Sequence, residues 1–89
     1  MPFSSPNFET AVHHHQTGRI DQAIDTCRRI LKSDPADAEV WHLYGLICWH
    51  IGRVHEAVEL LGQAIELNPT KAAFHNSLGL VYVSQNRHR

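Results

Sequence analysis

The sequence repeats itself with a period of 34 residues. Shifting the chain on itself by that number aligns Gly18-Arg19 with Gly52-Arg53 and Ala23 with Ala57. A fixed period of this length is the signature of a chain built from stacked copies of one supersecondary unit. The other pairs that coincide are Pro35 with Pro69, Gly45 with Gly79 and Leu46 with Leu80.

Each unit predicts a helix, a turn and a second helix. Within residues 38–71, apolar or small residues recur every three or four positions, in two runs. Asp37 and Thr70 are suited to cap the N-termini of helices. Gly52 suits a left-handed turn position, and Asn68-Pro69 ends the second helix. We expect helices near Pro6–Thr17, Ile20–Lys32, Asp37–Ile51, Val54–Leu67 and Lys71–Gln85.

These helices predict an all-α fold in a single domain that spans residues 1–89. Short connections make consecutive helices antiparallel neighbours. No segment shows the period-two alternation of a half-buried strand. We assign the first unit to about residues 4–37, the second to 38–71 and a partial third to 72–89.

The second unit resembles the tetratricopeptide repeat, whose pattern contains a Trp, Leu-Gly, an aromatic, an Ala, a second aromatic, another Ala and a closing Pro. Tyr44, Cys48 and Leu61 replace the Leu and the two aromatics of that pattern. The third unit has His75 in place of the Trp, and the first unit is degenerate. The resemblance implies a short right-handed α-solenoid with structural roles for Trp41, Tyr44, Gly45, Ala57, Ala64 and Pro69.

In this family the first helix of each pair lines a concave groove that grips an extended peptide or a partner's helix, and the second helix forms the back. The resemblance therefore implies an interaction module whose groove is lined by apolar side chains, with histidines along its edges. Leu46 and Trp49 would anchor a partner. His42, His50 and Asn76 would make polar contacts. The groove positions are Phe8, Val12, His15, Gln16, Glu39, His42, Leu46, Trp49, His50, Asn76, Leu80 and Val83.

The two tryptophans have different expected roles. Trp41 falls at a packing position of the repeat and is expected in the core, whereas Trp49 falls on the groove side. Trp49 is either an anchor for a partner or a side chain that packs on Phe8 or Val83 and holds the helices together.

Two known branches of the family do not match this chain. No Lys or Arg is among the groove positions, so the C-terminal carboxylate of a chaperone would find little counter-charge. The repeats that precede a glycosyltransferase domain carry a ladder of Asn, where this chain has Glu9, Leu43 and Ser77. The alternative function is the N-terminal segment of a larger enzyme, such as a glycosyltransferase, that presents substrate or mediates oligomerisation.

Eight histidines are the one compositional oddity. None has another His three or four positions away, which is the spacing that helical zinc sites favour, and the neighbours His13 to His15 diverge by about 100° per residue. We expect no metal site and no cofactor. A further hypothesis is that His15, His42 and His50 meet across neighbouring helices, so that acidification would charge the groove and alter its affinity.

Cys27 and Cys48 fall at packing positions of the repeat, where an unpaired Cys behaves as a small hydrophobe. No Gly-rich strand-to-helix turn or oxyanion-binding device accompanies them. We expect neither a disulfide framework nor enzymatic activity.

The charge of the chain restricts its partners. Lys and Arg number 8 and Asp and Glu 9, giving a formal net charge of −1, so there is no basic surplus for nucleic acid or an anionic membrane. The apolar stretches are far below the roughly 20 residues that span a bilayer, and the first residues lack the features of a signal peptide. We expect a cytoplasmic protein that binds a protein or peptide.

The sequence stops directly after the first helix of the third unit. A helix without its partner leaves apolar surface uncovered. We expect either a fragment of a longer array or self-association of two copies through this helix, for example by exchanging it. The residues assigned to self-association are Phe74, Leu78, Val81 and Tyr82.

Overall fold

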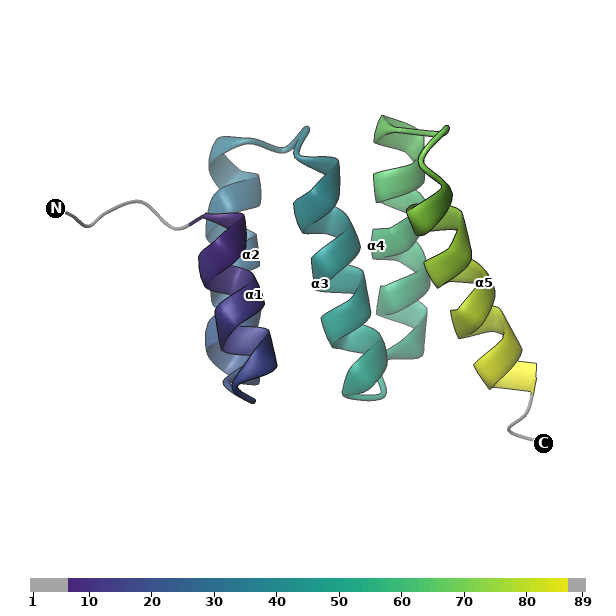
Figure 1. Cartoon of the computed structure of the whole chain (residues 1–89), viewed down its shortest axis with the longest axis horizontal. Helices are drawn as coiled ribbons and strands as arrows, with labels where there is room; N and C mark the ends of the chain where they lie inside the picture. Colours follow the sequence, from purple (N-terminus) through teal and green to yellow (C-terminus); the bar gives the residue numbers. More distant parts are fainter. Residues whose placement is uncertain (1–6, 87–89) are drawn as a thin grey trace, which may run out of the picture.

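The computed structural model describes residues 7–86, and these form five helices and no strands (Figure 1). The prediction of an all-α fold with five helices is confirmed, and the expected bounds agree to within one or two residues. The expected first-helix start at Pro6, residues 4–6 of the first unit and residues 87–89 of the third lie outside the described residues. The helices are α1 (Phe8–Gln16), α2 (Ile20–Ser33), α3 (Ala38–His50), α4 (Val54–Leu67) and α5 (Ala72–Asn86).

The helices form two layers. Figure 1 shows α1, α3 and α5 in front, with α2 and α4 behind them. The most extensive contacts are between α3 and α4 and between α1 and α2, whereas α1 touches α3, and α3 touches α5, over a much smaller area. We call the surface formed by α1, α3 and α5 the odd-helix face.

The turns inside the two helix pairs are copies of each other. Gly18 has a φ of 80° and Gly52 a φ of 87°, which lie in the left-handed region that favours glycine. The residue after each glycine is an arginine, Arg19 or Arg53, and its backbone amide donates a hydrogen bond to a carbonyl oxygen of the preceding helix at 2.8 Å. The predicted role of Gly52 is confirmed, and the repeated turn folds each pair into an antiparallel hairpin.

The connections between the pairs are also repeated. Trp41 Nε1 donates a hydrogen bond to the carbonyl oxygen of Pro35 at 2.8 Å. In the next unit, His75 Nε2 donates to the carbonyl oxygen of Pro69 at 2.7 Å. A carbonyl oxygen only accepts, so His75 carries a proton on Nε2. The replacement of Trp by His in the third unit thus preserves this hydrogen bond.

One of the two expected helix caps is confirmed and the other is wrong. The side chain of Asp37 accepts from the amide of Val40 at the start of α3. Thr70 does not cap α5, because its hydroxyl lies 3.4 Å from Asn68 Oδ1 instead. Lys71, which lies 34 residues after Asp37, occupies the capping position, and its carbonyl accepts a hydrogen bond from the amide of Phe74 in the first turn of α5. The repeat register therefore decides which residue starts the helix.

The core lies between the two layers. Ala57 and Ala64 have no exposed surface, and Trp41 and Tyr44 are half-buried, in agreement with their expected structural roles. The side chains of Trp41 and Tyr44 pack against a hydrophobic cluster of buried residues from α1, α2 and α3. The buried members of this cluster are Ala11, Ala23, Cys27, Ile30, Leu31, Val40, Leu43 and Ile47.

Gly45 allows α3 to approach α4 closely. A Cβ atom at this position would lie 2.9 Å from Leu61 Cγ and 3.3 Å from the carbonyl oxygen of Ala57. Leu61 and Ala57 are themselves fully buried, so neither has free space into which to move. At Gly79, the matching position of α5, a Cβ atom would meet nothing within 4 Å.

This difference predicts opposite effects of the same substitution at the two glycines. Gly45→Ala should lower the free energy of unfolding by about 1–3 kcal/mol, because the methyl group overpacks the contact between α3 and α4. Gly79→Ala should leave it unchanged or raise it by up to about 1 kcal/mol, because alanine favours a helix interior. Urea unfolding followed by circular dichroism measures both. An equal effect of the two substitutions would contradict the proposed close approach.

Candidate functional site

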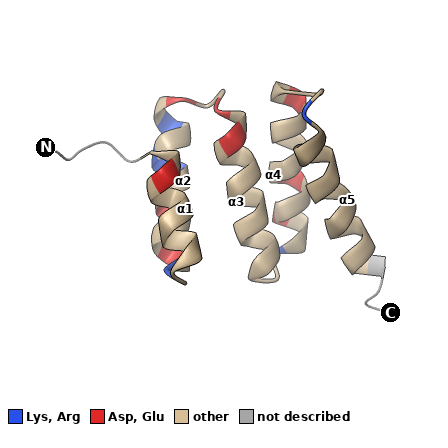
Figure 2. Ribbon diagram, in the orientation of Figure 1, with Lys and Arg blue, Asp and Glu red and all other residues tan. Residues whose placement is uncertain are grey.

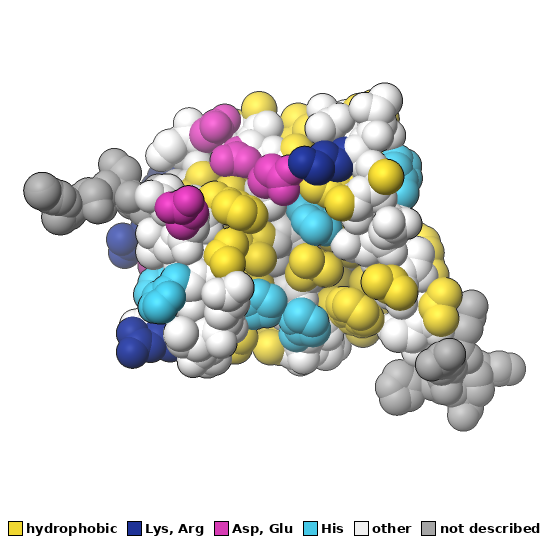
Figure 3. Space-filling view, in the orientation of Figure 1, with side chains coloured by type: hydrophobic (Ala, Val, Ile, Leu, Met, Phe, Trp, Pro, Cys, Tyr) yellow, Lys and Arg dark blue, Asp and Glu magenta, His cyan; other side chains and the backbone are white. Residues whose placement is uncertain are grey.

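The odd-helix face carries all the predicted groove residues. Those residues belong to α1, α3 or α5, and none of them is fully buried. The most exposed of their large apolar side chains are Leu80 and Val83 on α5, with 57% and 51% of their surface accessible. Apolar and histidine side chains gather across this face in Figure 3. The fold therefore leaves apolar and histidine side chains accessible on the odd-helix face.

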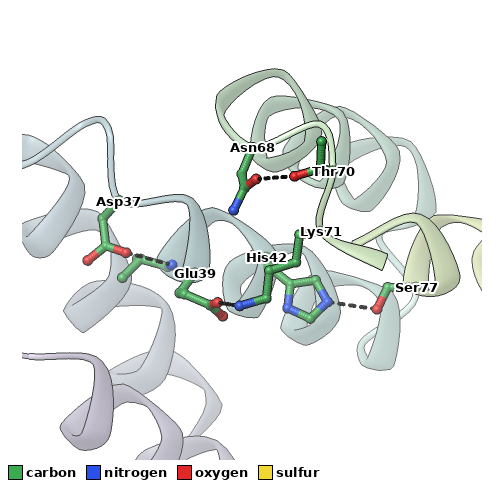
Figure 4. Close-up of polar contacts among 8 residues, drawn as sticks. Asp37, Glu39, His42, Asn68, Thr70, Lys71 and Ser77 are labelled. Carbon is green, nitrogen blue, oxygen red and sulfur yellow. Dashed lines mark hydrogen bonds and ion pairs between the residues drawn. The ribbon is translucent and has the colours of Figure 1, made fainter. Parts of the chain in front are cut away.

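Charge is confined to one end of this face. Figure 2 shows α3 with charge only near its start and α5 without any along its described length. The charged residue of α3 is Glu39, which forms an ion pair with Lys71 at the start of α5 (Figure 4). Apart from this pair and Glu9 in the first turn of α1, the face offers apolar and hydrogen-bonding side chains, with no other Lys, Arg, Asp or Glu on the three helices. No helix among the described residues is long and apolar enough to cross a membrane.

Hydrogen bonds between side chains link the odd helices in a regular pattern. Each bond joins a residue of one odd helix to the residue 35 positions later on the next odd helix. The spacing is one residue longer than the repeat. We call this pattern the cross-repeat ladder. Its rungs are His15 Nε2 with His50 Nδ1 at 3.0 Å, His42 Nε2 with Ser77 Oγ at 2.7 Å, and Trp49 Nε1 donating to Ser84 Oγ at 3.1 Å.

The histidine hypothesis is correct for two of the three residues. The rings of His15 and His50 stack with their centroids 5.1 Å apart and an interplanar angle of 24°. Burial lowers the pKa of His15, and the neighbouring His50 lowers it further. His42 does not join them, because its Nε2 contacts Ser77 on α5 instead. The face therefore holds one histidine pair and one separate histidine.

His42 lies between an apolar ring and an ion pair. Its ring centroid is 4.8 Å from that of Phe74, and its Nε2 contacts Ser77 (Figure 4). Burial lowers the pKa of His42, while Glu39 acts in the opposite direction and Lys71 lowers the pKa further. The folded protein therefore favours the neutral imidazole.

Trp49 holds two odd helices together. Its indole Nε1 donates to Ser84 on α5, and its ring stacks on His50 with the centroids 5.5 Å apart. The expected packing of the indole on Phe8 or Val83 stays a prediction. Trp49 remains half-buried, so part of the indole is still accessible from the odd-helix face.

The residues assigned to self-association divide into two groups. Phe74 and Val81 have no exposed surface, so their assignment to a free face is wrong. They lie 34 residues after Val40 and Ile47, which are also fully buried, and the repeat register turns all four toward the preceding helices. The other two retain accessible surface, with Leu78 half-buried and Tyr82 48% exposed.

The two cysteines are free thiols with no accessible surface. Burial raises the pKa of Cys27 to about 12, with a further contribution from the neighbouring Cys48. Burial also raises the pKa of Cys48, and Glu56 adds to this shift. A thiol that stays protonated near neutral pH is a poor nucleophile. The environment of both cysteines therefore suits packing.

Comparisons with known proteins agree with the repeat pattern. The family model described as "Tetratricopeptide repeat" matches residues 8–61, and the one described as "TPR repeat" matches residues 45–86. A solved structure of MamA from Desulfovibrio magneticus RS-1, beginning at position 41, superimposes with a TM-score of 0.83 at 21% sequence identity, covering 91% of this chain and 46% of that chain. Another crystal structure of MamA gives a TM-score of 0.80 at 28% identity, with 90% and 47% covered.

The chain spans less than half the length of these MamA chains. A search of the curated proteins found no match.

The environment of His42 predicts a loss of stability in acid. Because the pKa of His42 is lower in the folded chain than in the unfolded chain, its contribution is fully present above the unfolded pKa and is lost as the pH falls from there through the folded pKa. Urea unfolding at about pH 7.5 and about pH 5.5 should show this loss, and His42→Gln should reduce it. His55→Gln, at an exposed position of α4, is the control and should keep the loss seen in the wild type. Equal pH dependence in His42→Gln and the wild type would refute the assignment.

Proposed function

This chain belongs to the tetratricopeptide repeat family, and we propose that it is an interaction scaffold that holds an extended peptide or a partner helix against the odd-helix face. The observation that carries this proposal is the exposure of Leu80 and Val83 beside the half-buried Trp49, on a face that the core of the chain does not use. Contiguous apolar surface on a folded protein is typical of a binding site.

The chemistry of the face restricts the partner. Because α5 and most of α3 carry no charged residue, the partner should present apolar side chains to this region. The polar side chains of His50 and Asn76 are exposed and can form hydrogen bonds at its margin. A strongly charged segment would lose hydration over this surface without gaining a counter-charge.

Trp49 is suited to be the central anchor of the face. Its bond to Ser84 and its stacking on His50 fix the indole before any partner arrives. An anchor that is already ordered loses little conformational entropy on binding. Tryptophan is also among the residues that contribute most to binding free energy at protein interfaces.

Peptides selected from a random display library on the purified chain provide the first test. Leu80→Ser with Val83→Ser should weaken their binding by at least about tenfold, because both side chains would lie in the interface. The matched control is Ile51→Ser with Leu67→Ser, which removes two apolar side chains, each 38% exposed, from the ends of α3 and α4. Fluorescence anisotropy measures both affinities. A control that loses as much affinity as the first variant would contradict binding at the odd-helix face.

A second test separates the anchoring role of Trp49 from its structural role. Ser84→Ala keeps the indole but removes the acceptor of its N–H, together with the bond that the Ser84 hydroxyl donates to the Val81 carbonyl, so it should cost about 1 kcal/mol of stability with little change in peptide affinity. Trp49→Ala should reduce stability and also weaken binding by at least about tenfold. The measurements are urea unfolding and anisotropy at a temperature where both variants are folded. If Trp49→Ala remains folded and binds as well as Ser84→Ala, Trp49 is not an anchor.

A further inference from the structure

The first rung of the cross-repeat ladder brings two imidazole nitrogens from different helices together. His15 Nε2 on α1 lies 3.0 Å from His50 Nδ1 on α3. When both rings are neutral, one N–H donates to the lone pair of the other ring. The other rungs each pair a ring with a serine hydroxyl, so the first rung alone joins two nitrogen ligands.

We propose that His15 and His50 form an open binding site for a late divalent transition-metal ion, Cu²⁺ or Ni²⁺, between α1 and α3. Neutral imidazole is a common ligand of these ions. On binding, the shared proton moves to the outer nitrogen of its ring, so that His15 coordinates through Nε2 and His50 through Nδ1. The two rings remain neutral, and no net proton is released.

The separation of the two nitrogens indicates which ions fit. With metal–nitrogen bonds of about 2.0–2.1 Å, nitrogens 3.0 Å apart subtend an angle of about 95° at the metal. Adjacent ligands of a square-planar or tetragonal ion meet at nearly this angle, and Cu²⁺ and Ni²⁺ prefer such geometries.

The surroundings of the pair also suit an exchangeable ion. His50 is exposed and His15 is half-buried, so the ion can enter from solvent and the rings can turn toward it. Neither α1 nor α3 contains a Lys or Arg whose charge would repel it. The described residues contain no group of three or more His, Cys, Asp or Glu side chains that could hold a metal, so water would complete the coordination.

A bound ion would connect two helices that touch each other little. It would thereby tie α1 to α3 across the odd-helix face, and it should raise the melting temperature because it binds only the folded pair. Trp49 provides a reporter, because its ring stacks on His50 with an interplanar angle of 22° and Cu²⁺ and Ni²⁺ quench tryptophan emission at short range.

The experiment titrates CuCl₂ and NiCl₂ into the full chain without an affinity tag and follows tryptophan emission and the melting temperature. We expect saturable quenching with one ion per chain, a higher melting temperature, and reversal of both by EDTA. His15→Gln and His50→Gln should each weaken binding at least about tenfold, since loss of even an outer-shell partner costs about 10–100-fold. Should His15→Gln fail to fold, His50→Gln at the exposed position provides the test.

The controls are His13→Gln and His55→Gln, which alter exposed histidines on α1 and α4. Both should bind as the wild type does. Equal quenching in all four variants would mean an adventitious ion only and would overturn the proposal. Quenching without any rise in the melting temperature would overturn it as well, because an ion held by both helices must stabilise the folded chain.

Discussion

The close contact between α3 and α4 is the constraint on which the rest of this structure depends. It requires Gly45 opposite Ala57 and Leu61, because a single added methyl group would meet both neighbours. Small residues at such a crossing allow two helix backbones to approach, and the dense packing that results buries apolar side chains and so stabilises the fold. When the two helices of a pair are packed together, the side chains of the first helix that do not contact the second helix are left for the odd-helix face.

The odd helices are connected to one another by a different kind of interaction. They share little packed surface, and the cross-repeat ladder supplies directional bonds where apolar contact is scarce. This arrangement leaves apolar side chains such as Leu80 and Val83 uncovered between the rungs. The small contact between the odd helices and the 35-residue spacing of the rungs therefore explain two features: the apolar surface that is available to a partner, and the pairing of His15 with His50.

The sequence predicted the helices, the Gly52 turn and the small residues of the crossing because each depends on contacts within one 34-residue unit. It did not predict what depends on how one unit lies on the next. Thr70 was chosen as a cap for its side chain, although the register with Asp37 points to Lys71. The same register would have placed Phe74 in the core. The one expectation of this kind that holds is that His15 meets His50, and it came from assigning both residues to the groove side of neighbouring first helices.

The connections between helix pairs act as spacers of fixed length. Pro35 and Pro69 each accept a hydrogen bond from the ring six residues later, first an indole and then an imidazole. This bond sets the number of residues between one pair and the next. Every rung uses the same offset, so a single residue inserted between α2 and α3 would have to be accommodated within this connection, at the expense of the hydrogen bond to Pro35, for the rung between α1 and α3 to keep its geometry. The length of the connection is therefore coupled to the geometry of the polar face.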